Sequence, residues 1–326
     1  MRDIVTARPD AQLEQFRASV IDGLGATEKW LSSRYFYDTE GDLIFQKIME
    51  MPEYYLTRAE EEIFLRQTDA LIDALVDDRQ EFDLIELGAG DGIKTHHLLR
   101  RMLERNRHPF YRPIDISANA LQKLAETLRR EMPNLHYRGE QGEYFDVLKR
   151  ASRNPGVPRL VLFLGSNIGN LPRPRAIELL CLTEALLGPA DRVLVGFDLK
   201  KDPHVILRAY DDPQGHTRDF NLNLLRRINR ELGGDFNPGK FIHTAVYNPM
   251  QGSALSYLVS THEQVVHIAG AERPFHFRAW ESIHTELSQK YDVTMIEDMA
   301  SEAGLRIQKI FFDQRNYFAD VVFTPE

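Results

Sequence analysis

The sequence predicts an α/β fold, a sheet with helices on its faces, into which a second domain is inserted. Three observations predict it. Apolar segments alternate with helical patterns in the middle of the chain, and a glycine-rich turn follows the first segment. After residue 200 the alternation gives way to short strand patterns. With 326 residues, 43% of them hydrophobic, the chain can bury one large core or two smaller ones.

The predicted strands of the sheet are four apolar segments, at residues 82–87, 111–116, 159–165 and 192–198. The predicted helices between them lie at 94–106, 117–131 and about 173–187, and Gly188-Pro189 closes the last of these. The chain ends in two strand patterns, 305–313 and 316–323, joined by a short turn, which predicts a hairpin.

The region after residue 200 has a different pattern. Two helical segments, 203–212 and 218–234, precede alternating stretches at 241–249, 254–260, 263–268 and 275–287. Thr294 and Glu297 then match a T-x-x-E capping box for a helix at 295–303, which Gly304 would stop. We therefore expect an α/β domain of residues 61–199 and 289–326 and an α+β domain of residues 9–60 and 200–288.

The composition argues against several classes of protein. A formal net charge of −9 lacks the Lys/Arg excess that nucleic-acid phosphates require. No apolar run reaches the roughly 18 residues of a membrane span, so we expect no membrane partner. The single cysteine, Cys181, allows no intrachain disulfide, so we expect a cytoplasmic protein. Cys181 lies in an apolar helical pattern that is typical of a buried small side chain. His262 and His267 are one residue too far apart for the H-E-x-x-H zinc motif, so we expect no metal. Nothing indicates an obligate protein partner.

The glycine turn, in DLIELGAGDGIKT, has three common interpretations. A phosphate loop requires another glycine-to-lysine spacing, and a dinucleotide site requires a glycine where Ile93 stands. The third is G-x-G-x-G shortly after an acidic residue, which is typical of methyltransferases that use S-adenosylmethionine. A tight strand–helix turn without a ligand is the alternative. Asp115 favours the methyl-donor interpretation, because it ends the second predicted strand, where such sheets bind ribose hydroxyls. Glu143 and Tyr144 suit the adenine amino group and ring.

Other stretches of the chain are more specific than the glycine turn. They include YFYD, PEYYLTRAE, GSNIGNL, RAYDDPQGHTRDF and IHTELSQKY, and they run through most of the sequence. With them the chain resembles the histidine-specific Nα-methyltransferases, which make histidine betaine for ergothioneine biosynthesis. The resemblance implies a Rossmann-like methyltransferase domain, and a substrate-binding domain formed by the N-terminal segment and the insertion. It implies three methyl transfers from S-adenosylmethionine to the α-amine of L-histidine, giving hercynine.

The resemblance also implies site residues. The donor would be lined by Gly88, Gly90, Lys94, Asp115, Glu143, Tyr144 and Asn167. The substrate would contact Tyr37, Tyr54, Asn170, Tyr210, Ser256, Glu286 and Ser288, with Asn170 and Tyr54 at the reacting amine.

The chemistry of the substrate-side residues is consistent with an imidazole. Glu286 and Ser288 are two apart, so in an extended segment they face the same way. The carboxylate can accept from one ring N–H while the hydroxyl donates to the other nitrogen. Asn170 can accept from the amine and direct its lone pair, and Tyr37 and Tyr210 offer hydroxyls.

One departure from the family pattern keeps other functions open. Ser256 stands where the family often has Met, and a small polar side chain there would enlarge or rehydrate the pocket. Another acceptor, such as tryptophan, is therefore an alternative, and a non-catalytic small-molecule-binding protein is a second one. The chain has no H-x-x-x-H-x-E run, which the iron-dependent sulfoxide synthase of ergothioneine biosynthesis contains. We therefore expect the sulfoxide synthase to be a separate chain.

Overall fold

The computed structural model describes residues 4–5, 9–76, 81–150 and 156–326. The chain divides into two compact units. The first unit comprises the described residues of 1–6, 56–200 and 289–326, and the second those of 7–55 and 201–288. The boundary that we placed between residues 60 and 61 falls inside helix α3 (Tyr55–Arg66), so residues 56–60 belong to the first unit.

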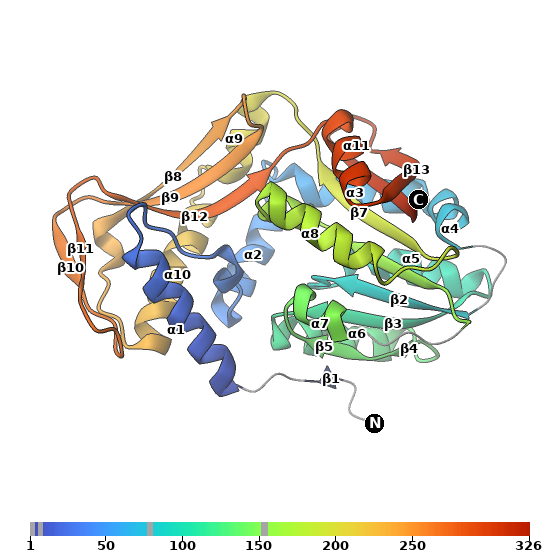
Figure 1. The fold of residues 1–326 in the computed structure, drawn as a ribbon, viewed down its shortest axis with the longest axis horizontal. Helices are drawn as coiled ribbons and strands as arrows, with labels where there is room; N and C mark the ends of the chain where they lie inside the picture. The colour runs from blue at the N-terminus through green and yellow to red at the C-terminus, as the bar shows by residue number, and fades with distance from the viewer. Residues whose placement is uncertain (1–3, 6–8, 77–80, 151–155) are drawn as a thin grey trace. The chain divides into compact units, whose positions relative to one another are not determined.

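The first unit is built on a mixed sheet (Figure 1). In the described residues its strand order is β1-β5-β3-β2-β6-β7-β14-β13, with β4 beside β3. The strands are β1 (Ile4–Val5), β2 (Glu81–Leu87), β3 (His108–Asp115), β4 (His136–Tyr137), β5 (Gly139–Gln141), β6 (Arg159–Phe163), β7 (Arg192–Asp198), β13 (Leu305–Phe312) and β14 (Phe318–Pro325). Neighbours from β1 to β7 pair in parallel, whereas β14 is antiparallel to both β7 and β13.

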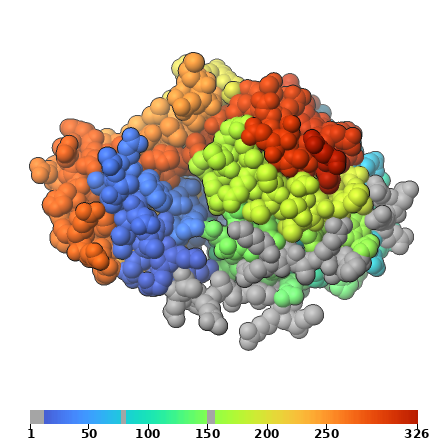
Figure 2. All heavy atoms as spheres, viewed as in Figure 1, coloured from blue at the N-terminus to red at the C-terminus, as the bar shows by residue number. Residues whose placement is uncertain are grey.

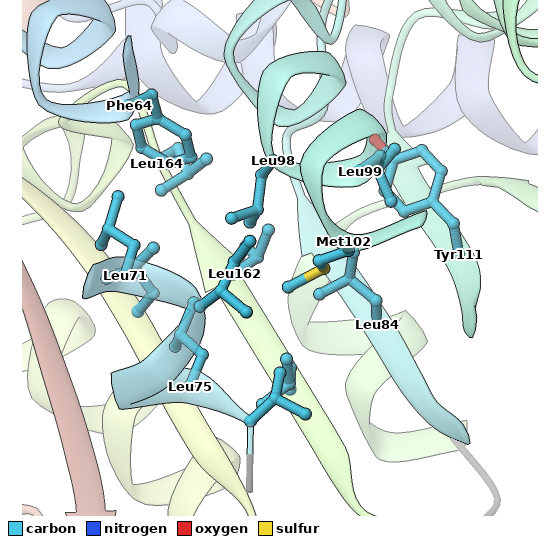
Figure 3. Close-up of a cluster of buried hydrophobic side chains, with 14 of the residues drawn as sticks. Phe64, Leu71, Leu75, Leu84, Leu98, Leu99, Met102, Tyr111, Leu162 and Leu164 are labelled. Atoms are coloured by element: carbon cyan, nitrogen blue, oxygen red, sulfur yellow. The ribbon is translucent and has the colours of Figure 1, made fainter. Parts of the chain in front are cut away.

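Helices cover both faces of this sheet because its strands are apolar on both sides. One face packs on α3, α4 (Thr68–Leu75), α5 (Ile93–Glu104) and α6 (Ala118–Glu131). The other packs on α7 (Tyr144–Arg150), α8 (Arg173–Glu184) and α11 (Val293–Glu302). Figure 3 shows the first core, where Leu162 of β6 points toward Leu75 of α4 and Met102 of α5. Its neighbours in the strand, Val161 and Phe163, belong to the second core.

The predicted α/β sheet with helices on its faces is confirmed, as is the terminal hairpin. The predicted cap of the last helix is wrong. Helix α11 begins at Val293, and the side chain of Asp292 accepts from the Met295 amide at 2.9 Å. Aspartate caps as well as threonine does, and Asp292 is also held by Lys200 Nζ at 2.7 Å.

Figure 2 shows α8 beside the C-terminal segment, where Arg173 Nη1 contacts Glu302 Oε2 at 3.2 Å.

The second unit combines helices with a small sheet of order β12-β9-β8, in which β8 and β9 pair antiparallel. Its core joins Phe16 and Phe36 of the N-terminal segment to Leu224, Ile228 and Leu258 of the insertion. Its helices are α1 (Pro9–Gly25), η1 (Ser33–Phe36), α2 (Thr39–Glu50), α9 (Pro203–Tyr210), α10 (His216–Leu232) and η3 (Pro238–Lys240). Its strands are β8 (Phe241–Asn248), β9 (Ser253–Ser260), the pair β10 (Gln264–Val266) and β11 (Phe275–Phe277), and β12 (Ser282–Gln289).

Candidate active site

The glycine turn joins β2 to α5 at the carboxyl edge of the parallel strands. Gly88 and Gly90 have φ values of 71° and 55°, which glycine adopts without the strain of a side chain. A Cβ added at Gly90 would meet no atom within 4 Å among the described residues, so space lies beside this backbone. The turn therefore presents bare main chain to open space, which suits a ligand that lies against it.

Asp115, at the end of β3, holds the turn in place. Its Oδ2 accepts from the Gly90 amide and its Oδ1 from the Ser117 amide, both at 2.8 Å. Its carbonyl accepts from the Gly142 amide at 3.0 Å, which brings the segment before α7 to the same strand end. Glu143 and Tyr144 follow directly, so Asp115 lies at the junction of the donor-side segments expected from the sequence.

The donor-side residues of three separate turns come together in the first unit. A Cβ on Gly88 would lie 2.9 Å from Asn167 Nδ2 and 3.7 Å from Tyr144 Cε1. A Cβ on Gly165 would lie 3.6 Å from the same Asn167 nitrogen and 3.3 Å from Lys94 Nζ. The packing therefore leaves room for glycine alone at position 88 and groups four of the expected residues: Gly88, Lys94, Tyr144 and Asn167.

Tyr144 is the aromatic member of this group. Its ring packs edge-on against Phe163 at 5.3 Å between centroids. Burial, assisted by the charges of Asp115 and Glu143, raises the pKa of Tyr144 above its ordinary value. The phenol therefore stays protonated and can offer a ring edge and a hydroxyl donor.

Asn167 and Asn170 are the two ends of a short 3-10 turn, η2 (Asn167–Asn170), after β6. The residue before it, Ser166, has a left-handed φ of 55°, and its hydroxyl accepts from the Asp198 amide at 3.0 Å. A Cβ on Gly169 would lie only 2.7 Å from the carbonyl oxygen of Gln289. The turn is therefore clamped between β7 and the segment that begins at Gln289.

A buried ion pair supports that clamp. Asp198 Oδ2 and Lys290 Nζ are 2.8 Å apart, and both side chains are fully buried. Tyr291 donates its hydroxyl to the Ile168 carbonyl at 3.3 Å. Asn170 therefore sits on a backbone that several contacts fix.

The substrate-side residues of the second unit form two hydrogen-bonded pairs. Ser256 of β9 donates its hydroxyl to Glu286 Oε2 of β12 at 3.1 Å, and Ser256 is buried. Tyr210, the last residue of α9, donates to the Ser288 hydroxyl at 2.8 Å. Ser256 thus contacts the Glu286 carboxylate, which we expect to bind the substrate ring.

Tyr37 and Tyr54 lie on either side of one phenylalanine. The ring of Phe45 is 5.5 Å from Tyr37 and 6.2 Å from Tyr54, edge-on in both cases. Both tyrosines are partly buried against the core of the second unit. The packing fixes their rings, although the hydroxyl roles that the resemblance implies stay predictions.

Two buried carboxylates of the first unit were given no site role in the sequence analysis. Glu60 of α3 is fully buried; it pairs with Lys94 and accepts from the Gly165 amide at 2.7 Å. Glu86, the acid before the glycines, accepts from Thr95 Oγ1 at 2.6 Å and from the Tyr111 hydroxyl. The stretch PEYYLTRAE contains Glu60 and was the available signal, although nothing in it distinguishes this carboxylate from its acidic neighbours.

Two further searches cover the residues that the structure describes. No helix there is long and apolar enough to cross a membrane. No group of three His, Cys, Asp or Glu side chains in the same ranges could hold a metal ion.

Comparisons with known proteins agree over nearly the whole chain. The model of a family described as histidine-specific methyltransferase, SAM-dependent, matches residues 16–325. A histidine N-alpha-methyltransferase of Mycobacterium tuberculosis is 36% identical over 95% of this chain and 94% of its own length. The protein of that name in Mycolicibacterium smegmatis is 36% identical over 91% of both chains. Ergothioneine biosynthesis protein 1 of Neurospora crassa is 30% identical over 84% of this chain, and the match covers 31% of that protein.

Proposed function

This chain belongs to the family of histidine-specific, S-adenosylmethionine-dependent methyltransferases, and from that membership we propose that it methylates the α-amino nitrogen of L-histidine. The observation that carries the proposal is the length of the match, which includes both units rather than the donor-binding part alone. Three successive transfers would give the trimethylated betaine, hercynine. Ergothioneine biosynthesis in a cytoplasmic setting is the proposed context.

The proposed donor site consists of the glycine turn and its neighbours. The bare backbone at Gly88 and Gly90 would lie against the methionine and ribose parts of S-adenosylmethionine. Asp115 would accept from the ribose hydroxyls, and Glu143 and Tyr144 would contact the adenine. Lys94 is complementary to the one anionic group of the donor, its carboxylate. These residues fit the donor. Its ribose and adenine groups require acidic acceptors, its carboxylate requires a cation, and the donor must lie close to the main chain.

The proposed acceptor chemistry is mainly the orientation of an amine. The donor supplies a methyl group on a sulfonium sulfur, which a neutral amine can take. Asn170 would accept a hydrogen bond from that amine through its side-chain oxygen and so direct the nitrogen lone pair. Tyr54 would assist through its hydroxyl. Each of the first two transfers leaves an ammonium that must lose a proton before the next one.

The preference for histidine would come from β9 and β12. Glu286 would accept from one imidazole N–H, and Ser288 would donate to the other ring nitrogen. Tyr37 and Tyr210 would offer their hydroxyls to the substrate carboxylate or, through water, to the ring. The hydrogen bond from Ser256 to Glu286 supports this assignment, because it holds the carboxylate in one orientation. A charged acceptor held in this way favours a ring with N–H donors over a purely apolar one.

Mass spectrometry tests the proposed function. The purified protein is incubated with S-adenosylmethionine and L-histidine, and we expect products that carry one, two and three added methyl groups. Nα-acetylhistidine, whose amine is blocked, is the control and should remain unmethylated. Methylation of tryptophan without methylation of histidine would favour the alternative acceptor and refute the assignment.

A further inference from the structure

Glu60 links the two turns that the proposed donor site requires. It lies in α3, its side chain is fully buried, and its carboxylate forms an ion pair with Lys94 at the start of α5. The Gly165 amide donates a hydrogen bond to the same carboxylate, and its nitrogen lies 2.7 Å from Oε1 and 3.0 Å from Oε2. One side chain therefore joins the segment after the glycine turn to the segment before η2.

The position of this carboxylate is fixed by its surroundings. A Cβ added to Gly196 of β7 would lie 2.3 Å from Glu60 Oε1, so the strand backbone passes directly against the carboxylate. Position 196 therefore has no space for a larger residue while Glu60 is in place. Lys94 Nζ in turn lies beside Gly165, where an added Cβ would be 3.3 Å away. The ammonium is thus held next to Gly165 and the side chain of Asn167.

The charges of the cluster explain why Lys94 needs this partner. Burial opposes the charged form of Lys94, but the Glu60 carboxylate outweighs it, and the pKa of Lys94 is raised. A third group, Asp320 of β14, is fully buried, and neither of its carboxylate oxygens has a hydrogen-bond partner among the described residues. Burial and the charge of Glu60 raise the pKa of Asp320 well above its ordinary value. Lys94 is therefore paired with Glu60, and burial disfavours a second charged carboxylate at Asp320.

We propose that Glu60 is a positioning residue for donor binding, which holds the Lys94 ammonium and the Gly165 amide so that Lys94 binds the amino-acid end of the methyl donor. The proposal rests on the proposed function, since it takes the donor to be S-adenosylmethionine. In this proposal Glu60 acts on the donor through Lys94, with which it is paired. Because a lysine ammonium has three N–H donors, one that pairs with Glu60 still has two for a ligand carboxylate.

The test compares two ligands that differ at the amino-acid end. S-adenosylhomocysteine carries the amino-acid group, whereas 5′-methylthioadenosine lacks it and shares the adenosine part. Titration calorimetry measures both dissociation constants for the wild type and Glu60→Gln, which keeps the shape and an acceptor for Gly165. We expect the dissociation constant of S-adenosylhomocysteine to rise roughly tenfold, since the charge-assisted contact between Lys94 and the amino-acid end is lost. The constant of methylthioadenosine should change within about twofold.

Two further variants make the test specific. Lys94→Met should give the same selective loss, and the double variant should lose no more than either single one, because the two residues act as one unit. Glu61→Gln, on the same helix but partly exposed, is the matched control and should leave both constants unchanged.

Each other outcome counts against the proposal. An unchanged or tighter S-adenosylhomocysteine constant in Glu60→Gln would overturn it. An equal loss for both ligands, with a lower melting temperature, would mean that Glu60 supports folding alone. If Glu60→Gln does not fold, Lys94→Met decides, and loss of both ligands to the same degree overturns the proposal. A wild type that binds neither ligand would instead refute the proposed function itself, which separates the two failures.

Discussion

Asp115 holds two backbone amides at once, and its substitution therefore has two effects. The Gly90 and Ser117 amides both donate to it at 2.8 Å, so the carboxylate shapes the glycine turn, in addition to its proposed role at the ribose. Sequence position predicted the second role, because a strand end in such a sheet is where ribose is bound. The first role depends on contacts that the sequence does not reveal.

Asp115→Asn should raise the dissociation constant of S-adenosylhomocysteine about ten- to a hundredfold. The variant keeps the side-chain shape but removes the charge, and a hydrogen bond to a charged group contributes on the order of 1.5–3 kcal/mol. Titration calorimetry measures the change. Asp146→Asn, an exposed carboxylate at the start of α7, is the control. Unchanged affinity in Asp115→Asn would remove this residue from the donor site.

Glu286→Ala should lower kcat/KM for histidine about ten- to a hundredfold without weakening donor binding. The physical reason is the loss of a charge-assisted acceptor for the imidazole N–H. Ser288→Ala should act in the same direction but less, because a neutral hydroxyl contributes less. Phenylalanine and tryptophan should be almost insensitive to both changes. Ser282→Ala, at the exposed start of the same strand, is the matched control. An equal fall for all acceptors would show that Glu286 supports structure.

Glu60, which the sequence analysis missed, has partners far away along the chain. Glu60 pairs with Lys94 and contacts Gly165, which lies 105 residues further on. Periodicity places Glu60 on a helix but does not indicate which turn reaches it. Glu286 and Ser288, in contrast, are two apart in one strand, and this spacing alone predicts a shared orientation. Local geometry was therefore predictable and the buried charge pairs were not.

The η2 turn is the element on which the proposed amine site depends. Its entry through the left-handed Ser166 and its close approach at Gly169 are both held from outside, by Asp198 and by Gln289. The glycine at 169 is required for this approach, because even one added carbon would press on the Gln289 carbonyl.

Gly169→Ala should lower the melting temperature by several degrees and reduce turnover. The added methyl group would lie 2.7 Å from a backbone oxygen, and such overpacking costs roughly 1–3 kcal/mol. Differential scanning calorimetry measures the stability. Gly25→Ala is a suitable comparison, since its methyl group would meet an ordinary contact at 3.8 Å. Equal melting temperatures for the two variants would show that the turn can relax.

Asn170→Ala should lower kcat more than it weakens the donor, because the lost contact orients the nucleophile. Steady-state kinetics with histidine, together with titration of S-adenosylhomocysteine, separates the two effects. Asn119→Ala, a polar residue in the first turn of α6, controls for a general effect of removing an amide. If turnover changed less than about twofold while donor binding collapsed, Asn170 would be a donor or folding residue.

Among the elements, the sheet was the most predictable part. Strand β7 has the bounds that its apolar run predicted, 192–198, since a strand buried on both faces is apolar throughout. Helix α11 shows the limit. Asp292 and Thr294 are both good N-cap residues. Asp292 is the cap because its backbone is extended and the helix begins directly after it.

At the scale of the whole molecule, the titration of Glu86 links stability to pH. Burial raises the pKa of Glu86 to about 7 from 4.5, although hydrogen bonds from Thr95 and Tyr111 oppose the rise. The unfolded chain releases this proton at lower pH than the folded protein does. The folded state therefore binds more protons between about pH 4.5 and 7, and the free energy of unfolding falls as pH rises through that interval.

Glu86→Gln should remove this contribution, which is on the order of 3 kcal/mol across the interval. Melting temperatures measured between about pH 5 and 8 should fall more steeply with pH in the wild type than in the variant. Glu126→Gln, an exposed carboxylate on α6, should keep the slope of the wild type. Parallel curves for the wild type and Glu86→Gln would show that this carboxyl is already ionised in the folded protein.

The division of the second unit between two chain segments decides when it can fold during synthesis. Phe16 and Phe36 are made early, but Leu224 and Ile228, with which they share a core, follow almost 190 residues after Phe36. At roughly 5–20 residues per second, the first helices wait roughly 10–40 seconds on the ribosome for that core. The first unit waits longer still, because β14 ends at Pro325 and lies between β7 and β13. Apolar helix faces of both units are therefore exposed on the nascent chain until these later residues have been made, and chaperones can bind them in that interval.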